Sequence, residues 1–140
     1  MKFRKINSDY VIKMEKGDDV LKEIIEFCEK ENIKGGYFTG IGAASRVILG
    51  WFDPVTKVYS RKEVVDNLEI TSLIGNVGRM PNGDVLLHTH ITLADKNYGV
   101  IAGHVFKCEI SLVAEIFFRD LGEEVEKDTD PEFHLNFLKL

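Results

Sequence analysis

The sequence predicts an α+β fold: a mainly antiparallel sheet with one main helix packed against it. Two observations favour this class. Residues 20 to 28 have the apolar spacing of an amphipathic helix, whereas most of the chain after residue 36 consists of apolar and β-branched segments separated by turn residues. Consecutive strands joined by short turns pair antiparallel, because a parallel crossover needs about a dozen residues or more.

Gly17, Asp18 and Asp19 are predicted to open the helix. Asp18 and Asp19 stand at or near the N-cap, where a carboxylate accepts hydrogen bonds from free backbone N–H groups and suits the positive end of the helix dipole. We expect Gly35 and Gly36 to close the helix. Apolar residues recur between these ends at three- and four-residue spacing, which places them on one face: Val20, Leu21, Ile24, Ile25 and Cys28.

The strands are predicted from short apolar runs. Two precede the helix, at 3–6 and 10–14, and the others lie at 37–39, 47–52, 57–59, 68–74, 85–94 and 100–118. Turn residues at 53–54, 81–84 and 95–99 separate several of them. The glycine-rich stretch 35–45 leads into a strand pattern, whereas a phosphate-binding loop should open a helix. We therefore interpret these glycines as the bend of a strand that passes close to the helix or to a ligand pocket.

Length and charge bound the organisation of the chain. With 140 residues, 44% of them hydrophobic, we expect one domain over residues 1–140, with a core over about residues 10–120. From residue 120 onward there are seven acidic residues and two lysines, whereas the first 119 residues carry 16 acids and 16 bases. We expect the polar stretch 122–131 to be mobile, and the apolar residues that end the 121–140 tail to dock onto the body.

The expected compartment is the cytoplasm, with no membrane association. No apolar stretch approaches the roughly 20 residues that a bilayer span needs, and the first residues lack the apolar core of a signal peptide. Cys28 and Cys108 belong to no CxxC motif, so both are predicted to be reduced core residues. Direct binding to duplex DNA is not favoured, because such binding depends on a clustered basic surface that this chain does not supply.

Three histidines form the candidate site. His88 and His90 lie two residues apart in a predicted strand and therefore share a face. If the hairpin loop centres on Asn97, antiparallel pairing places His104 directly across from His90 and diagonal to His88. Three imidazoles with a vacant fourth position suit zinc, although iron, nickel or cobalt could substitute. The opposite face of the hairpin is apolar and is predicted to face the core: Leu87, Ile91, Leu93, Ile101 and Val105.

Other interpretations remain open from spacing alone. The three histidines could line a pocket or a subunit interface without binding metal. Glu109 and Glu115 could orient metal ligands or act as bases, although exposed strand carboxylates are commoner. We expect His134, in the tail, to have no role in the site. No GxSxG motif is present, so neither Ser45 nor Ser72 is a convincing nucleophile.

Five segments of the chain carry a family resemblance: 17–21 (GDDVL), 40–47 (GIGAASRV), 68–76 (LEITSLIGN), 88–95 (HTHITLAD) and 103–105 (GHV). In this order and spacing they resemble the plants-and-prokaryotes-conserved (PPC) domain, which occurs alone in bacteria and archaea and beside AT-hooks in plants. The resemblance implies an antiparallel sheet of about seven strands with a helix against it, assembled as a homotrimer. It also matches His88, His90 and His104 to positions where some prokaryotic members are thought to hold a metal. No RGRP-type AT-hook is present, so the minor-groove contact of the plant proteins does not carry over.

The functional hypothesis is a trimeric binding or regulatory protein, DNA- or transcription-associated, whose three-histidine pocket holds zinc or another divalent transition metal and a small anionic ligand. Catalytic activity is not favoured, because no obvious general base or substrate-binding motif accompanies the histidines. Two alternatives stay open. One is a zinc-dependent hydrolase or lyase acting on a small molecule. The other is an interaction module with DNA-linked partners, in which the histidines are incidental.

Overall fold

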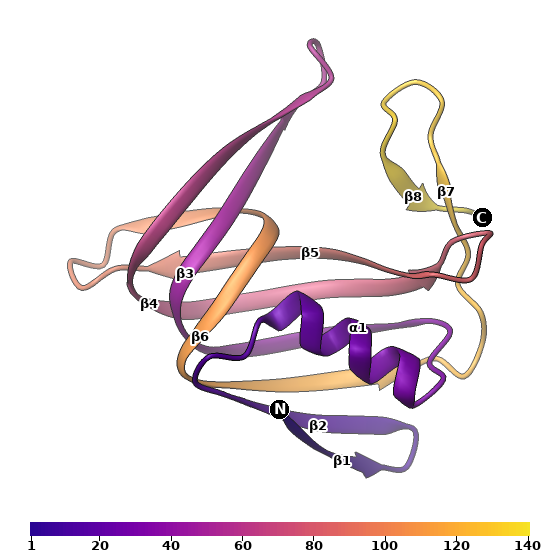
Figure 1. Ribbon diagram of the computed structural model, residues 1–140, viewed down its shortest axis with the longest axis horizontal. Helices are drawn as coiled ribbons and strands as arrows, with labels where there is room; N and C mark the ends of the chain where they lie inside the picture. Colours follow the sequence, from indigo (N-terminus) through magenta and orange to yellow (C-terminus); the bar gives the residue numbers. More distant parts are fainter.

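The computed structural model describes residues 1–140 and contains one helix and eight strands (Figure 1). The α+β class and the mainly antiparallel sheet are confirmed, with six strands in the main sheet and two in a separate C-terminal hairpin. The elements in chain order are β1 (Lys2–Ile6), β2 (Asp9–Glu15), α1 (Val20–Lys30), β3 (Gly36–Asp53), β4 (Val58–Arg79), β5 (Val85–Ala94), β6 (Val100–Asp120), β7 (Lys127–Thr129) and β8 (Asn136–Leu138).

The helix begins where the sequence predicted. The Asp19 side chain caps α1 by accepting from the backbone N–H groups of Leu21 and Lys22, both at 3.1 Å. The predicted end is wrong, because α1 stops at Lys30, five residues before the glycine pair. Asn32 reverses the chain there with φ 52°, a left-handed conformation that asparagine tolerates better than most residues.

Gly35 and Gly36 serve packing rather than helix termination. A Cβ on Gly36 would lie 2.7 Å from the ring of Phe118, and one on Gly35 would lie 2.7 Å from the carbonyl oxygen of Glu123. Both approaches are closer than a side chain can make without displacing its neighbour. The two glycines therefore let the start of β3 pass against β6 and against the C-terminal segment.

The main sheet has the order β1-β2-β6-β3-β4-β5, and β5 also pairs with β6, so the sheet closes on itself. Three strands are long and bent, β3, β4 and β6, with 18, 22 and 21 residues (Figure 1). The predicted segments 37–39 and 47–52 are both parts of β3, and 57–59 and 68–74 both fall largely in β4. Register shifts at Gly40/Gly42 and Ala44/Arg46 bend β3 without ending it, which confirms the strand interpretation of the glycine-rich stretch.

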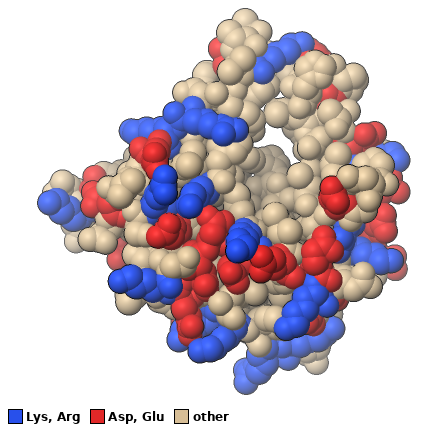
Figure 2. All heavy atoms as spheres, in the orientation of Figure 1, with Lys and Arg blue, Asp and Glu red and all other residues tan.

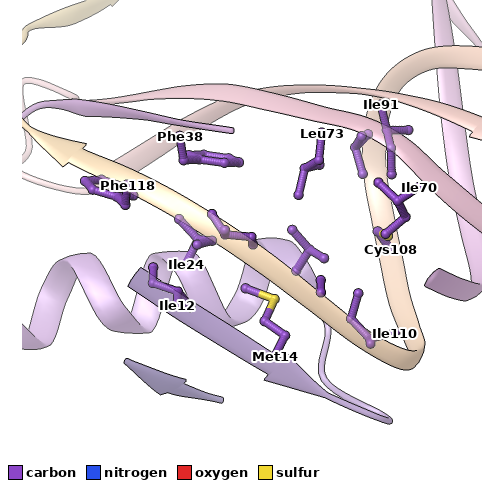
Figure 3. Packing of buried hydrophobic residues seen from close by; sticks show 14 of the residues in the cluster. Ile12, Met14, Ile24, Phe38, Ile70, Leu73, Ile91, Cys108, Ile110 and Phe118 are labelled. Carbon is purple, nitrogen blue, oxygen red and sulfur yellow. The ribbon is translucent and has the colours of Figure 1, made fainter. Parts of the chain in front are cut away.

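The buried apolar side chains form one cluster of 25 residues between the sheet and α1. Figure 3 shows Ile12 and Met14 from β2, Ile24 from α1, and Phe38 and Phe118 from β3 and β6 facing one another. The rings of Phe38 and Phe118 stack with centroids 6.1 Å apart. Packing of this kind makes the sheet a rigid support for groups on its other face.

The two cysteines are free and buried, as predicted. Burial raises the pKa of both the Cys28 and the Cys108 thiol to about 12, so neither is a reactive thiolate at neutral pH. The structure contains no helix whose length and apolarity would let it cross a membrane.

The C-terminal segment departs from the prediction of a mobile acidic stretch. Residues 127–129 form β7, which pairs with β8, and Lys127 is only 1% exposed. The Arg79 N–H donates to the carbonyl oxygen of Val125 at 2.8 Å, and Arg79 also forms an isolated parallel bridge with Glu126. We call residues 123–138 the C-terminal strap, because they cross the end of β4 and return as the β7–β8 hairpin (Figure 1).

Candidate metal centre

Three histidines converge on the β5–β6 hairpin in the predicted register. Strand β5 ends at Ala94 and β6 begins at Val100, and His90 pairs directly with His104. Ile91 and Leu93 are buried on the core side of β5, so the histidines stand on the opposite face. The face assignment and the convergence inferred from the sequence are both confirmed.

The ring nitrogens of the three histidines lie within reach of a single ion. One nitrogen from each of His88, His90 and His104 lies within 4.8 Å of the other two. The Nε2 atoms of His88 and His90 are 3.2 Å apart, and Nδ1 of His104 is buried without a hydrogen-bond partner. Three ring nitrogens this close together fit a divalent transition metal that prefers imidazole ligands.

The surroundings of His104 and His88 favour the neutral form of these two imidazoles. Burial lowers the pKa of His104 to about 4, and the charges of His88, His90 and Arg61 act in the same direction. Burial also lowers the pKa of His88, with further contributions from His90 and Lys127. Because a metal binds the neutral ring, the imidazoles of His88 and His104 would not have to lose a proton to accept one at pH 7.

Aromatic side chains hold His104 in place. Its ring centroid lies 5.3 Å from that of Tyr59 and 4.9 Å from that of Phe106. Gly50, directly across from His104 in β3, makes room for them, since a Cβ there would lie 2.9 Å from the Tyr59 ring and closer still to Phe106. Arg61 completes the group with its guanidinium 3.9 Å from the centroid of the Phe106 ring.

Two cavities flank His88. The first, of about 250 Å³, lies against the β7–β8 hairpin, where Figure 2 shows the molecule hollowed and lined mostly by uncharged atoms. It is bounded by Tyr59, Leu86, Leu87, His88, His104, Phe106, Leu135, Asn136 and Phe137. The second, of about 530 Å³, is bounded by Tyr37, Phe38, Thr39, Ile74, Gly75, Asn76, His88 and His90. Neither cavity is lined by a carboxylate.

The remaining candidates from the sequence lie away from the histidines. Glu109 pairs with Asp19 in an isolated bridge, and its carbonyl oxygen accepts from Ser45 Oγ at 3.4 Å. Glu115 is exposed and His134 lies in the exposed turn before β8. None of these side chains borders either cavity with the histidines.

Sequence reasoning missed three residues near the site: Asn76, Arg61 and Lys127. Asn76 could have been found, because a hairpin turn at 81–84 pairs it with His88 by the same register argument that located His104. The position of Arg61 depends on the bend of the long β3–β4 hairpin. Nothing local in the sequence indicates that Lys127, within an acidic stretch, is buried.

The fold and the site together define a class: a small α+β protein that carries a candidate three-histidine metal centre on one hairpin of its sheet. The sequence profile of the Plants and Prokaryotes Conserved (PCC) domain matches residues 1–122 of this chain, and the chain belongs to this family. The family resemblance noted in the sequence is thereby confirmed. No protein with a curated function matches the chain.

Solved structures agree with this assignment over the whole chain. A candidate DNA-binding protein from Bacteroides thetaiotaomicron is 30% identical, with 99% of this chain and 96% of that chain covered and a TM-score of 0.94. A metal-containing protein from Archaeoglobus fulgidus is 30% identical with full coverage of both chains and a TM-score of 0.87. A plant- and prokaryote-conserved protein from Pyrococcus horikoshii is 28% identical, with 99% and 94% covered and a TM-score of 0.87.

Proposed function

We propose that this protein is a PPC-type binding or regulatory module built around a zinc site with His88, His90 and His104 as ligands. The observation that carries the proposal is the convergence of one ring nitrogen from each histidine to within 4.8 Å of the others. Bound there, zinc would offer an open coordination position to water or to an oxygen ligand. The metal-containing relative from Archaeoglobus fulgidus, similar over its full length, supports the proposal.

The same site is proposed to take a small anionic ligand. The charged groups that act on the histidine pKa values are Arg61 and Lys127, both cationic, and no carboxylate borders the two cavities. A divalent cation would add to this positive field. The site would therefore attract anions although the chain as a whole carries a net charge of −5.

Binding is better supported than hydrolysis. A hydrolytic site needs a group that can accept a proton, and the cavities contain no carboxylate. Burial raises the pKa of Tyr59, so its phenol stays protonated at neutral pH. A turnover screen of the zinc-loaded protein with esters, lactones and phosphoesters tests this preference, and chelator-sensitive hydrolysis would reverse it.

If the protein has a regulatory role linked to DNA, we propose that partner proteins, and not this chain, contact the DNA. The relative from Bacteroides thetaiotaomicron is a candidate DNA-binding protein. In this chain, acidic and basic side chains are interspersed on the face seen in Figure 2, with no basic patch of the kind that binds phosphates. Binding of duplex DNA by the purified protein at low salt, weakening steeply as salt rises, would instead establish direct contact.

The homotrimer that the family resemblance implies is proposed to form through an exposed apolar surface. A row of directly paired residues crosses the sheet from Phe117 through Thr39 and Ile74 to His90, so all four side chains share one face. Phe117 is 64% exposed and Ile74 is 53% exposed, and Tyr37, Ile41 and Leu112 are also exposed. Further copies of the chain are proposed to cover this surface.

The proposal places the protein in the cytoplasm and treats residues 1–140 as one domain. A reducing compartment agrees with the two free, buried cysteines. The single cluster of buried side chains agrees with one folding unit.

Metal analysis of the purified protein tests the central proposal. We expect about one zinc per chain after expression with added zinc, and loss of that zinc in His88→Ala and His104→Ala. His134→Ala is the matched control and should keep the metal, because His134 lies outside the cluster. A wild-type protein that takes up no divalent metal, or cluster variants that retain it, would end the proposal.

A further inference from the structure

Lys127 is a buried cation without a counterion. It is 1% exposed and takes part in none of the ion pairs of the protein. Its ammonium donates one side-chain hydrogen bond, to Oδ1 of Asn76 at 2.6 Å. Burying a lysine in this way is costly, and surface lysines need no such arrangement. The effect of Lys127 on Asn76 can explain why the lysine is buried.

The contact fixes the direction of the Asn76 amide. An ammonium group can only donate, so it selects the amide oxygen and leaves Nδ2 pointing elsewhere. Nδ2 of Asn76 donates to no protein atom, and it is not among the buried side-chain atoms without a partner, which are Asp9 Oδ1, Thr89 Oγ1 and His104 Nδ1. Nδ2 is therefore not fully buried, and Asn76 lines the second cavity, of about 530 Å³.

That cavity also contains two of the histidines. Asn76 pairs directly with His88 across β4 and β5, which places their Cβ atoms about 4.5 to 5.5 Å apart on one face. His88 and His90 line the same space of about 530 Å³. A ligand that reaches the open position of a metal on the histidines thus comes within reach of the Asn76 amide.

The donor set selects a carboxylate. One amide N–H group beside a metal position matches the two oxygens of a carboxylate, whereas phosphate sites use several backbone N–H groups or an arginine fork. The walls supplied by Tyr37, Phe38 and Ile74 suit an apolar body attached to that group. A small monocarboxylate with an aromatic or aliphatic body satisfies both requirements.

The lysine comes from the C-terminal strap, outside the family match over residues 1–122. Gly78 makes its approach possible, because a Cβ there would lie 3.0 Å from the Lys127 side chain and 2.5 Å from the carbonyl oxygen of Val125. The strap thus contacts the site through the buried Lys127 side chain, which donates to Asn76.

We propose that the histidine site binds a small monocarboxylate through Asn76 as well as the metal, and that Lys127 is the positioning residue that holds the Asn76 amide for it. This inference rests on the proposed metal site. It assigns to the strap a part in ligand recognition, beyond its packing against β4.

Calorimetric titration of the zinc-loaded full chain with acetate and benzoate tests the proposal, with benzamide as the neutral probe. Benzoate should bind and benzamide should not. Asn76→Ala and Lys127→Met should each weaken benzoate binding at least tenfold while zinc content stays at the wild-type level. The double variant should bind as weakly as Asn76→Ala alone, because Lys127 acts through Asn76. Asn67→Ala and Lys62→Met, exposed positions on β4, are the matched controls and should bind as the wild type does.

The outcomes separate this inference from the metal proposal. Absence of zinc in the wild type overturns both. If the zinc-loaded wild type does not bind benzoate, or if Asn76→Ala binds benzoate with unchanged affinity, only the carboxylate inference is overturned. If the effects of the two single substitutions simply add in the double variant, Lys127 contributes its charge and is not a positioning residue. Should Lys127→Met fail to fold, the Asn76→Ala comparison decides the role of the amide.

Discussion

At the scale of single residues, the protein buries polar groups that have one hydrogen-bond partner or none. Lys127 keeps its ammonium beneath the strap with one hydrogen-bond acceptor, and Thr89 Oγ1 is buried between apolar neighbours with none. Each such group lowers stability. A functional role would explain why it is present. For Lys127 the structure suggests such a role, whereas for Thr89 it shows none.

The buried ammonium predicts a characteristic pH dependence of stability. Burial lowers the pKa of Lys127 to about 8, below its value of 10.5 in the unfolded chain. Between these two pH values the unfolded state binds more protons, so the free energy of unfolding rises with pH there. Relative to Lys127→Met, the wild type should gain stability, on the order of 3 kcal/mol, as the pH rises from about 8 to 10.5. Denaturant unfolding at several pH values measures the difference, and parallel curves for the two proteins would contradict it.

Thr89→Val should stabilise the protein. The substitution keeps the shape of the side chain and removes a buried hydroxyl that has no partner, so we expect a gain of roughly 1 kcal/mol in the free energy of unfolding. Thr71→Val is the matched control. It removes an exposed hydroxyl that donates to the Thr92 carbonyl oxygen at 3.1 Å, and it should be neutral or slightly destabilising. Chemical denaturation compares the two, and a loss of stability in Thr89→Val would point to an unseen partner for the hydroxyl.

At the scale of elements, the bends of the long strands bring the site together. The β5–β6 hairpin carries all three histidines, but the aromatic residues around His104 come from β4 and β6 (Figure 1). Arg61 comes from near the start of β4. The bulges of β3 let it pair with β4 on one side and with β6 on the other while it changes direction. A straight β3 could not follow both partners.

Gly42→Ala tests the bend. A Cβ at Gly42 would lie 2.6 Å from Cα of Ala114 and closer to the Val113 carbonyl oxygen, so the backbone of β6 must move. We expect a loss of roughly 2 to 3 kcal/mol in the free energy of unfolding, as for other overpacked sites. Gly83→Ala, with φ 90° and nothing near its Cβ, should cost only about 1 to 2 kcal/mol from backbone strain. Thermal and denaturant unfolding of both variants measure which one loses more stability. Equal losses would show that the backbone of β6 can shift at little cost in free energy.

At the scale of the whole molecule, the exposed apolar surface on β3, β4 and β6 is the feature that a monomer leaves unexplained. It joins the histidine cluster directly, since Ile74 pairs with His90. If copies of the chain cover this surface, the proposed metal site would lie at a subunit boundary, and access of a ligand to it would depend on assembly. The charged residues seen in Figure 2 around α1 belong to a face that would stay in solvent.

Phe117→Glu should break the proposed homotrimer. A carboxylate in the middle of an apolar contact is desolvated without a partner, so assembly should weaken by at least tenfold. Light scattering coupled to gel filtration measures the mass, with about three chains of 15.9 kDa expected for the wild type. Val55→Glu is the control, because Val55 is 86% exposed at the tip of the β3–β4 hairpin. A wild type that is monomeric at micromolar concentration would contradict the proposal.

The sequence by itself determined the helix start at Asp19, the α+β class and the histidine register. These features are local: capping depends on adjacent residues, and the two-residue period with a short loop at Asn97 decides which side chains meet. Only the tertiary structure decided that the β-rich segments merge into long bent strands, and that Lys127 reaches Asn76 across 51 residues of sequence. Such contacts depend on where distant segments pack, and the acidic neighbours of Lys127 in sequence indicate an exposed residue. The histidines could therefore be found from their spacing, whereas the groups that surround them could not.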